Sequence, residues 1–159
     1  MDPCIGHGVN FILRLLLTAI HSLLKLNWLV RRPRTFGAHA LALTPEGEAI
    51  LVRLRYARGW RLPGGGHGEH EDPRDAVLRE LREEIGMVSH GEVRLAAELE
   101  DAADHKRDLA ALLIVRDVCY QPRRWSWEVE AILETRVDDL PADVSPRAAR
   151  WLEALKGKI

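Results

Sequence analysis

Apolar residues recur every three or four positions over residues 9–30, close to the start of the chain. A second face of the same stretch carries polar and basic side chains, among them Arg14 and Lys25. This period is typical of an amphipathic helix, which the pattern predicts to end near Pro33. We expect residues 1–32 to form a helical extension that packs on its own domain or in a homodimer. The alternative is a partner-binding helix or one that makes a peripheral membrane contact.

Short apolar runs bounded by turn residues follow the helical stretch and predict β-strands. The first two, residues 36–43 and 49–54, flank the turn signal Thr44-Pro45-Glu46-Gly47 and together predict a hairpin. Three later runs predict further strands at residues 93–99, 109–118 and 129–137.

Two more helices are predicted from their end signals. Asp72 is placed to cap a helix with Pro73 at its first position and Gly86 near its end. A glycine-rich loop precedes that helix, and Ser145-Pro146 opens a last helix through Leu155. Strands and helices mix without an internal repeat, so we expect one domain that contains both α and β structure (α+β) over residues 33–159.

The charge of the chain is divided unevenly, although the formal net charge of its 159 residues is only −1. Residues 1–35 contain five Lys or Arg residues against one Asp, a net charge of +4, which leaves −5 for the remainder. An acidic body does not attract phosphates through its overall field, so an anionic ligand needs local basic residues or bound cations. Nucleic acid is therefore not expected as a main partner.

Cysteine usage and the first apolar run bear on the location of the protein. Cys4 and Cys119 are the only cysteines, too few for a disulfide framework or a four-thiolate zinc site. A reducing, cytoplasmic setting is the expectation. Arg14 interrupts the first apolar run, which argues against a signal peptide, and His21 and Lys25 argue against a membrane-spanning helix.

Three glutamates, Glu80, Glu83 and Glu84, cluster within about one turn of the helix that follows the glycines. Leu81 and Ile85 lie on the adjoining apolar stripe, so we expect one side of the helix to be buried and the other to present carboxylates. Carboxylates this close repel one another, and a hard cation such as Mg²⁺ or Mn²⁺ would convert the repulsion into binding. Without the glycines upstream, an ordinary solvated helix face would be the simpler interpretation.

The spacing of these residues extends over about 23 positions. It reads Gly65, five residues, Glu71, seven residues, Arg79-Glu80-Leu81, one residue, Glu83-Glu84, one residue, Gly86-Met87. This segment resembles the complete Nudix box, and the wider stretch from Pro33 to Asp139-Leu140-Pro141 is similar to the rest of a Nudix domain.

The resemblance implies an α/β/α sandwich with a mixed sheet and a metal site built by a loop, a helix and a loop. It implies that Glu83 and Glu84 bind a divalent metal, Mg²⁺ or Mn²⁺, and that Glu80 is either a ligand or the base on water. It also implies that Arg79 orients a glutamate by ion pairing and that the carbonyl of Gly65 completes the metal shell.

Glu71 would be a further metal ligand or a residue that fixes the loop, by the same resemblance. One position departs from the family pattern, because His70 stands where the family usually has glycine before the first motif glutamate. The loop is therefore expected to differ in shape. His67 and His70 are interpreted as solvated loop residues and are left out of the site.

Three residues outside the box are further candidates. Glu128 stands where many similar sequences carry a glutamate before a distal Leu-Pro, and it is either an extra ligand or base, or a surface residue. Arg55 and Trp60, near the glycines, are the candidates for contacts with substrate phosphate and base.

The function implied is metal-dependent hydrolysis of a diphosphate linkage in a nucleoside diphosphate linked to another moiety, by attack of water on phosphorus. A proline that marks ADP-ribose-cleaving relatives is missing, since no proline occurs between Pro73 and Pro122, and a tyrosine of dinucleoside-polyphosphate relatives is replaced by Asp104 and His105. The substrate is therefore expected only at the level of its class. The rivals are a catalytically silent module that binds nucleotides and a membrane-surface protein that works through residues 1–32.

Overall fold

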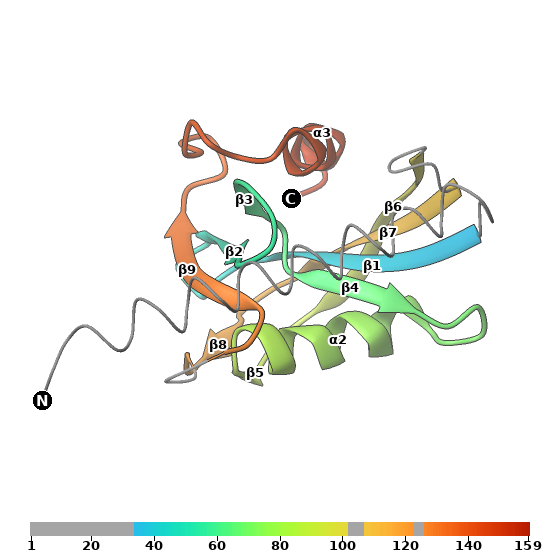
Figure 1. The fold of residues 1–159 in the computed structure, drawn as a ribbon. Coiled ribbons are helices and arrows are strands. Elements are labelled where there is room, and N and C mark those ends of the chain that lie inside the picture. The colour runs from blue at the N-terminus through green and yellow to red at the C-terminus, as the bar shows by residue number, and fades with distance from the viewer. Residues whose placement is uncertain (1–33, 102–106, 123–125) are drawn as a thin grey trace, which may run out of the picture.

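The computed structural model describes residues 34–101, 107–122 and 126–159. Strands and helices in these ranges mix along the chain (Figure 1). The strands are β1 (Arg34–Ala42), β2 (Ala49–Leu54), β3 (Trp60–Arg61), β4 (Gly64–His67), β5 (Met87–Ser89), β6 (Val93–Asp101), β7 (Arg107–Val115), β8 (Cys119–Tyr120) and β9 (Val129–Thr135). The helices are α2 (Pro73–Glu84) and α3 (Pro146–Leu155).

The strands form three sheets, and the largest has the order β4-β1-β7-β6. It is mixed, because β1 runs parallel to β7 while the β1–β4 and β7–β6 pairs are antiparallel. A three-stranded sheet has the order β3-β2-β9, and β5 pairs with β8. The prediction of a mixed sheet is confirmed.

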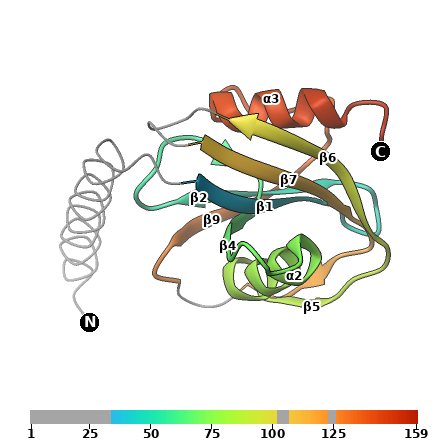
Figure 2. The same cartoon turned by 90° about the vertical axis from the view of Figure 1, so that its right-hand side faces the viewer.

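The two helices cover opposite faces of the strands, with α2 on one side and α3 on the other (Figure 2). Side chains of a strand alternate between its two faces, and β1 serves both layers in this way. Ala38 and Ala40 belong to the core under α2, whereas Leu41 belongs to the core under α3, where Trp151 and Leu152 pack. The α/β/α sandwich expected from the resemblance is therefore confirmed.

The ends of both helices follow the sequence signals. The Asp72 carboxylate accepts a hydrogen bond from the backbone N–H of Arg74 at 2.8 Å, and Pro73 opens α2. Gly86 follows the last turn of α2 with φ of 74°, a conformation that glycine adopts at little cost. The Ser145 hydroxyl accepts from the Ala148 N–H at 3.3 Å and caps α3.

Two local predictions need correction. The turn after β1 forms, with the Thr44 N–H donating to the Glu48 carbonyl, but β1 and β2 pair only at the Leu43–Ala49 bridge and then enter different sheets. The glycine-rich segment is strand β4 and not a loop, since it pairs with β1 from Phe36 to His39. Long-range pairing of this kind overrides local glycine preference.

The expected helix within residues 1–32 lies outside the described residues. Among those described, no helix is long and apolar enough to span a membrane.

Candidate active site

The core of the candidate site is the contact between β4 and α2, where backbone and carboxylate approach closely. A Cβ atom placed on Gly65 would lie 2.7 Å from the carboxyl carbon of Glu80, a distance that real Cβ atoms essentially never show. A side chain at position 65 would therefore displace the Glu80 carboxylate from this contact. The register of Gly65 opposite Ala38 on β1 brings the glycine segment alongside the helix.

Glu84 is the most enclosed of the carboxylates, with only 9% of its surface exposed. Its Oε2 atom accepts a hydrogen bond from the backbone N–H of Gly64 at 2.8 Å. Burial raises the pKa of Glu84 to about 8, and the charges of Glu80 and Glu128 add to the rise, while the Gly64 hydrogen bond opposes it. The favourable interactions of the charged carboxylate therefore do not offset the free energy lost by removing it from water.

Glu80 sits beside it and is paired with Arg79. The guanidinium donates from Nη1 to Oε1 of Glu80 at 2.6 Å. Burial raises the pKa of Glu80, the bond to Arg79 lowers it, and the charges of Glu83 and Glu128 raise it further. The net direction is upward, so burial and neighbouring negative charge outweigh the ion pair.

Arg79 also reaches the segment that precedes the helix. Its Nη2 atom lies 3.4 Å from the carbonyl oxygen of Gly66 and 3.5 Å from Oε1 of Glu71. The other oxygen of Glu71 accepts from the backbone N–H of Gly68 at 3.2 Å. One guanidinium therefore links the turn after β4 to the glutamates of α2, which is the geometry of a side chain that orients carboxylates.

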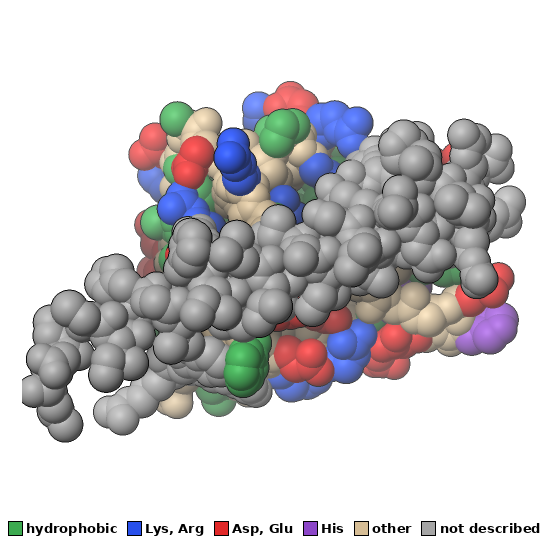
Figure 3. Space-filling view, in the orientation of Figure 1, with side chains coloured by type: hydrophobic (Ala, Val, Ile, Leu, Met, Phe, Trp, Pro, Cys, Tyr) green, Lys and Arg blue, Asp and Glu red, His purple; other side chains and the backbone are tan. Residues whose placement is uncertain are grey.

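Glu83 differs from its two neighbours. Its side chain is 59% exposed, and its nearest ion-pair contact is Arg79, at 3.9 Å. The expectation that one side of α2 is buried while the other presents all the carboxylates is wrong, because Glu84 is buried with Leu81 and Ile85. In Figure 3, acidic and basic side chains alternate along the edge of the molecule where α2 lies.

Glu128, although distant in sequence, acts electrostatically on the same pair. Its charge helps to raise the pKa values of Glu80 and Glu84, and with burial it raises the pKa of Tyr56 to about 12. Arg55 is next to it, since the Arg55 N–H donates to the Glu128 carbonyl at 2.8 Å. The charge of Glu128 thus acts on the glutamates of α2, while the contacts of Arg55 are with the segment that carries Glu128.

Trp60 is placed elsewhere, in the core under α3 and only 9% exposed. The guanidinium of Arg53 lies 4.3 Å above its ring and also pairs with Asp143 at 2.5 Å. The structure does not bring Trp60 together with the glutamates, so its proposed contact with a substrate base stays a prediction.

Comparison with known sequences decides the family. The family model described as "NUDIX domain" matches residues 33–155, which is most of the chain. The chain belongs to the Nudix family. The match begins where the N-terminal extension was expected to end.

Several Nudix relatives are similar over part of their length. The m7GpppN-mRNA hydrolase dcap-2 of Caenorhabditis elegans is 30% identical over 129 residues, which are 77% of this chain and 16% of that protein. An RNA pyrophosphohydrolase of Hydrogenovibrio crunogenus is 34% identical over 61 residues, 38% of this chain and 36% of that protein. The chain therefore matches about a third or less of the length of these curated relatives.

Two solved structures of MutT proteins are similar to this chain over almost their whole length. The MutT NUDIX hydrolase from Burkholderia pseudomallei has a TM-score of 0.66 and 26% identity, covering 78% of this chain and 99% of that one. A MutT protein from Methanosarcina mazei has a TM-score of 0.61 and 25% identity, covering 80% and 96%. The sandwich described above is thus the Nudix fold.

The donor chemistry at the Nudix helix fits a divalent cation. Mg²⁺ and Mn²⁺ prefer oxygen ligands, and Glu84 is a buried carboxylate whose charge is not balanced by its one backbone hydrogen bond. As they stand, no three His, Cys, Asp or Glu side chains of the described ranges are close enough together to hold a metal ion. The donors at this helix are therefore of the type that a divalent cation requires.

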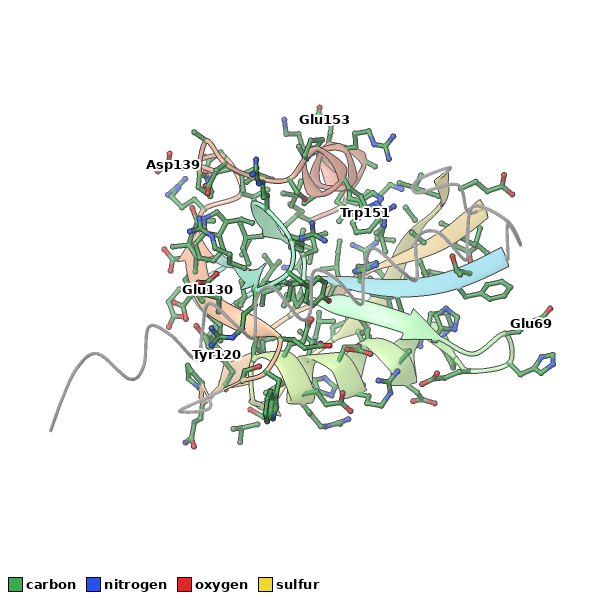
Figure 4. The ribbon with its side chains drawn as sticks, viewed as in Figure 1. Glu69, Tyr120, Glu130, Asp139, Trp151 and Glu153 are labelled. Atoms are coloured by element: carbon green, nitrogen blue, oxygen red, sulfur yellow. The ribbon has the colours of Figure 1, made fainter. Side chains whose placement is uncertain are left out.

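Sequence reasoning missed a second group of polar atoms, on the α3 side of the sheet. His39 on β1 packs 4.4 Å from the ring of Trp151, which points from α3 toward the strands (Figure 4). Within the described part of the chain, the buried atoms Nδ1 of His39, Nε1 of Trp151 and Nε of Arg53 have no hydrogen-bond partner. Burial and the charges of Arg147 and Arg61 lower the pKa of His39 to about 3, so the ring is neutral. Alternation along the first strand was the available signal, because it places His39 on the face of Leu41.

Proposed function

We propose that the chain catalyses the metal-dependent hydrolysis of a diphosphate linkage in a nucleotide substrate. The observation that carries the proposal is the Glu80–Glu84 pair, drawn against β4 by the Gly64 hydrogen bond and by the close approach of Gly65. Keeping a carboxylate with a pKa of about 8 at this contact costs stability, which a bound divalent cation would recover. A module that binds nucleotides without catalysis would gain nothing from this loss of stability.

The glutamates of α2 and Arg79 have separate roles in this reaction. Glu84 holds the cation from inside the α2–β4 contact, and Glu83 offers a second oxygen donor from the exposed face. Glu80, with its raised pKa, accepts a proton from the attacking water while Arg79 fixes its orientation. When bound, Mg²⁺ or Mn²⁺ supplies charge neutralisation of the diphosphate and a more acidic water.

The test is a panel of nucleoside triphosphates, nucleotide sugars and dinucleotides, each with Mg²⁺, with Mn²⁺ and with chelator, scored for released phosphate or pyrophosphate. We expect turnover of at least one substrate that stops with chelator. In ¹⁸O-labelled water, the label should enter one phosphate product and no sugar product. No turnover across the panel, or label in the sugar, would contradict the proposal.

A second candidate substrate is the 5′ end of an RNA, favoured by the names of the two relatives, an mRNA hydrolase and an RNA pyrophosphohydrolase. The charge distribution argues for small nucleotides, since the chain beyond residue 35 has a net charge of −5 against +4 before it. A 5′-triphosphorylated RNA and a capped RNA added to the panel decide between them. A kcat/KM at least tenfold higher for RNA would favour the second candidate.

A further inference from the structure

The segment that carries Glu128 into β9 is fixed by the side chain of Ser126. Its hydroxyl oxygen accepts from the backbone N–H of Val129 at 3.0 Å and of Glu128 at 3.3 Å. Both donors stand at the entry of an edge strand, where backbone groups otherwise turn to water. One hydroxyl thus sets the direction in which the chain leaves Ser126.

Arg55 holds the same segment from the other side. Its Nε atom donates to the carbonyl of Ser126 at 3.2 Å, and its backbone N–H donates to the carbonyl of Glu128 at 2.8 Å. The β2–β9 register shifts between Arg53 and Leu54, so regular pairing does not fix Glu128 by itself. The Ser126 hydroxyl and the Arg55 guanidinium therefore hold this segment in place of the hydrogen bonds that regular strand pairing would make.

Glu128 needs this restraint because its side chain is exposed at the start of the strand. Its neighbour Val129 nonetheless packs in the same buried core as Leu81 and Ile85, which places the start of β9 alongside the helix that carries Glu80 and Glu84. An exposed glutamate on an unrestrained loop would spend little time facing them.

We propose that Ser126 is a positioning residue, whose hydroxyl holds the backbone of Glu128 so that its carboxylate faces the Glu80–Glu84 pair and contributes to the cation site. This inference rests on the function proposed above. It does not make Ser126 a catalytic residue, because the hydroxyl is engaged with backbone N–H groups and acts only through Glu128.

The first experiment compares Ser126→Ala with Ser126→Thr. The alanine variant should lose about tenfold in kcat with KM unchanged, the lower end of what residues supporting metal ligands contribute. The threonine variant keeps the oxygen acceptor and should recover most of the loss. Equal kcat in the parent and Ser126→Ala would overturn the proposal.

Thr44→Val is the matched control, because the Thr44 hydroxyl likewise accepts a backbone N–H, that of Glu48 at 3.2 Å, at the other end of β2. We expect it to lower the thermal midpoint without changing kcat. If Ser126→Ala only lowered the thermal midpoint in the same way, the hydroxyl would have a purely structural role and the proposal would fail.

A double-mutant cycle tests whether Ser126 acts through Glu128. Glu128→Gln should reduce both kcat and the affinity for Mn²⁺ measured by calorimetry without substrate. Ser126→Ala added to Glu128→Gln should then change neither quantity further. Additive losses would show that Ser126 acts independently of Glu128.

The Mn²⁺ affinities separate failure of this inference from failure of the proposed function. A parent chain without turnover on any substrate contradicts the function, while a roughly tenfold weaker Mn²⁺ affinity in Ser126→Ala than in Thr44→Val still supports the positioning role. Equal Mn²⁺ affinity in these two variants, or a parent that binds no Mn²⁺, would overturn the inference.

Discussion

Glu83 and Glu84 are adjacent in sequence, yet their environments are opposite. Glu83 is 59% exposed, whereas Glu84 is 9% exposed and held by the Gly64 N–H. A free energy cost attaches to the charge of Glu84 and hardly to that of Glu83, because only a buried charge is separated from water. The two glutamates should therefore differ sharply when each is neutralised.

Replacing Glu84 with Gln should stabilise the protein in the presence of chelator. The folded-state pKa of about 8 lies above the ordinary value of 4.5, so the parent loses stability as pH rises from about 4.5 to about 8. The glutamine variant lacks this slope, and its advantage should grow to a few kcal/mol at the upper end of that window. Thermal midpoints across this pH range measure it.

Glu83→Gln is the control and should change the midpoint little with chelator at any pH in this window. With saturating Mg²⁺ the order of parent and Glu84→Gln should reverse, since only the parent gains binding free energy in full. Equal Mg²⁺ stabilisation of both, together with parental turnover in Glu84→Gln, would remove Glu84 from the site.

Gly65→Ala should remove turnover while leaving the fold intact. The added methyl group would lie 2.7 Å from the carboxyl group of Glu80, and a flexible side chain can move away at small cost in stability. The displaced carboxylate would leave Arg79 and the attacking water, so we expect kcat to fall by about 100-fold or more.

Gly66→Ala is the matched control, since its added Cβ meets no atom closer than the carbonyl oxygen of Phe36 at 3.8 Å. We expect near-parental kcat and thermal midpoint for it. A loss of kcat as large as that of Gly65→Ala would mean that any side chain on β4 disturbs the site, and that the contact with Glu80 is not special.

At the level of single residues, the spacing along the chain predicts which carboxylates share a helix turn but not how deeply each is buried. The burial of Glu84 depends on β4 lying against α2, and β4 is placed by pairing with β1, which lies 25 to 31 residues earlier in the chain. Trp60 shows the same limit, because its place under α3 follows from contacts with Arg53 and Val144. Local patterns contain no information on such contacts.

Among the elements, the helices were the more predictable, because their ends are encoded within a few residues. Asp72-Pro73 and Ser145-Pro146 begin α2 and α3 where the cap and proline signals place them. Strand β4 was mistaken for a loop, since three consecutive glycines have low strand preference and only the neighbouring β1 makes them a strand.

The cap of α2 should matter for stability more than for chemistry. Asp72→Ala removes the acceptor for the Arg74 N–H and should cost about 0.5–2 kcal/mol. Asp72→Asn keeps an acceptor at that position and should restore most of the stability. Urea denaturation measures both, and turnover at a temperature where all variants are folded should stay within about threefold of the parent. A large loss of kcat in both variants would place Asp72 in the site.

At the scale of the whole molecule, the site depends on two cores that lie on opposite faces of the same strands. The core under α2 holds the glutamates against β4, and the core under α3 holds His39 and the residues around Trp151. Because β1, β2 and β7 each contribute alternate side chains to both, a change in either core reaches the site through these strands. The mixed sandwich itself was predictable from the order of strands and helices together with the resemblance of the box.

We expect residues 33–159 to fold and to hydrolyse substrate without residues 1–32. The two cores run from Ala38 to Leu155, and the family match covers residues 33–155, so the contacts that place α2 against β4 lie within this part. We expect a cooperative thermal transition and a kcat within about threefold of the full chain. Loss of solubility alone would indicate that residues 1–32 cover apolar surface.

Adding vesicles that contain anionic lipid to the full chain and to residues 33–159 tests whether residues 1–32 bind membranes. Residues 1–32 have a net positive charge, so a membrane-binding extension would bind such vesicles at low salt. It would release them as salt rises, since ions screen the attraction beyond about 10 Å at 0.1 M. Binding by the full chain that the shortened chain lacks would assign the membrane contact to the extension. A shortened chain that is folded and soluble but turns over no substrate would instead show that the extension completes the active site, and residues 33–159 would no longer count as the catalytic unit.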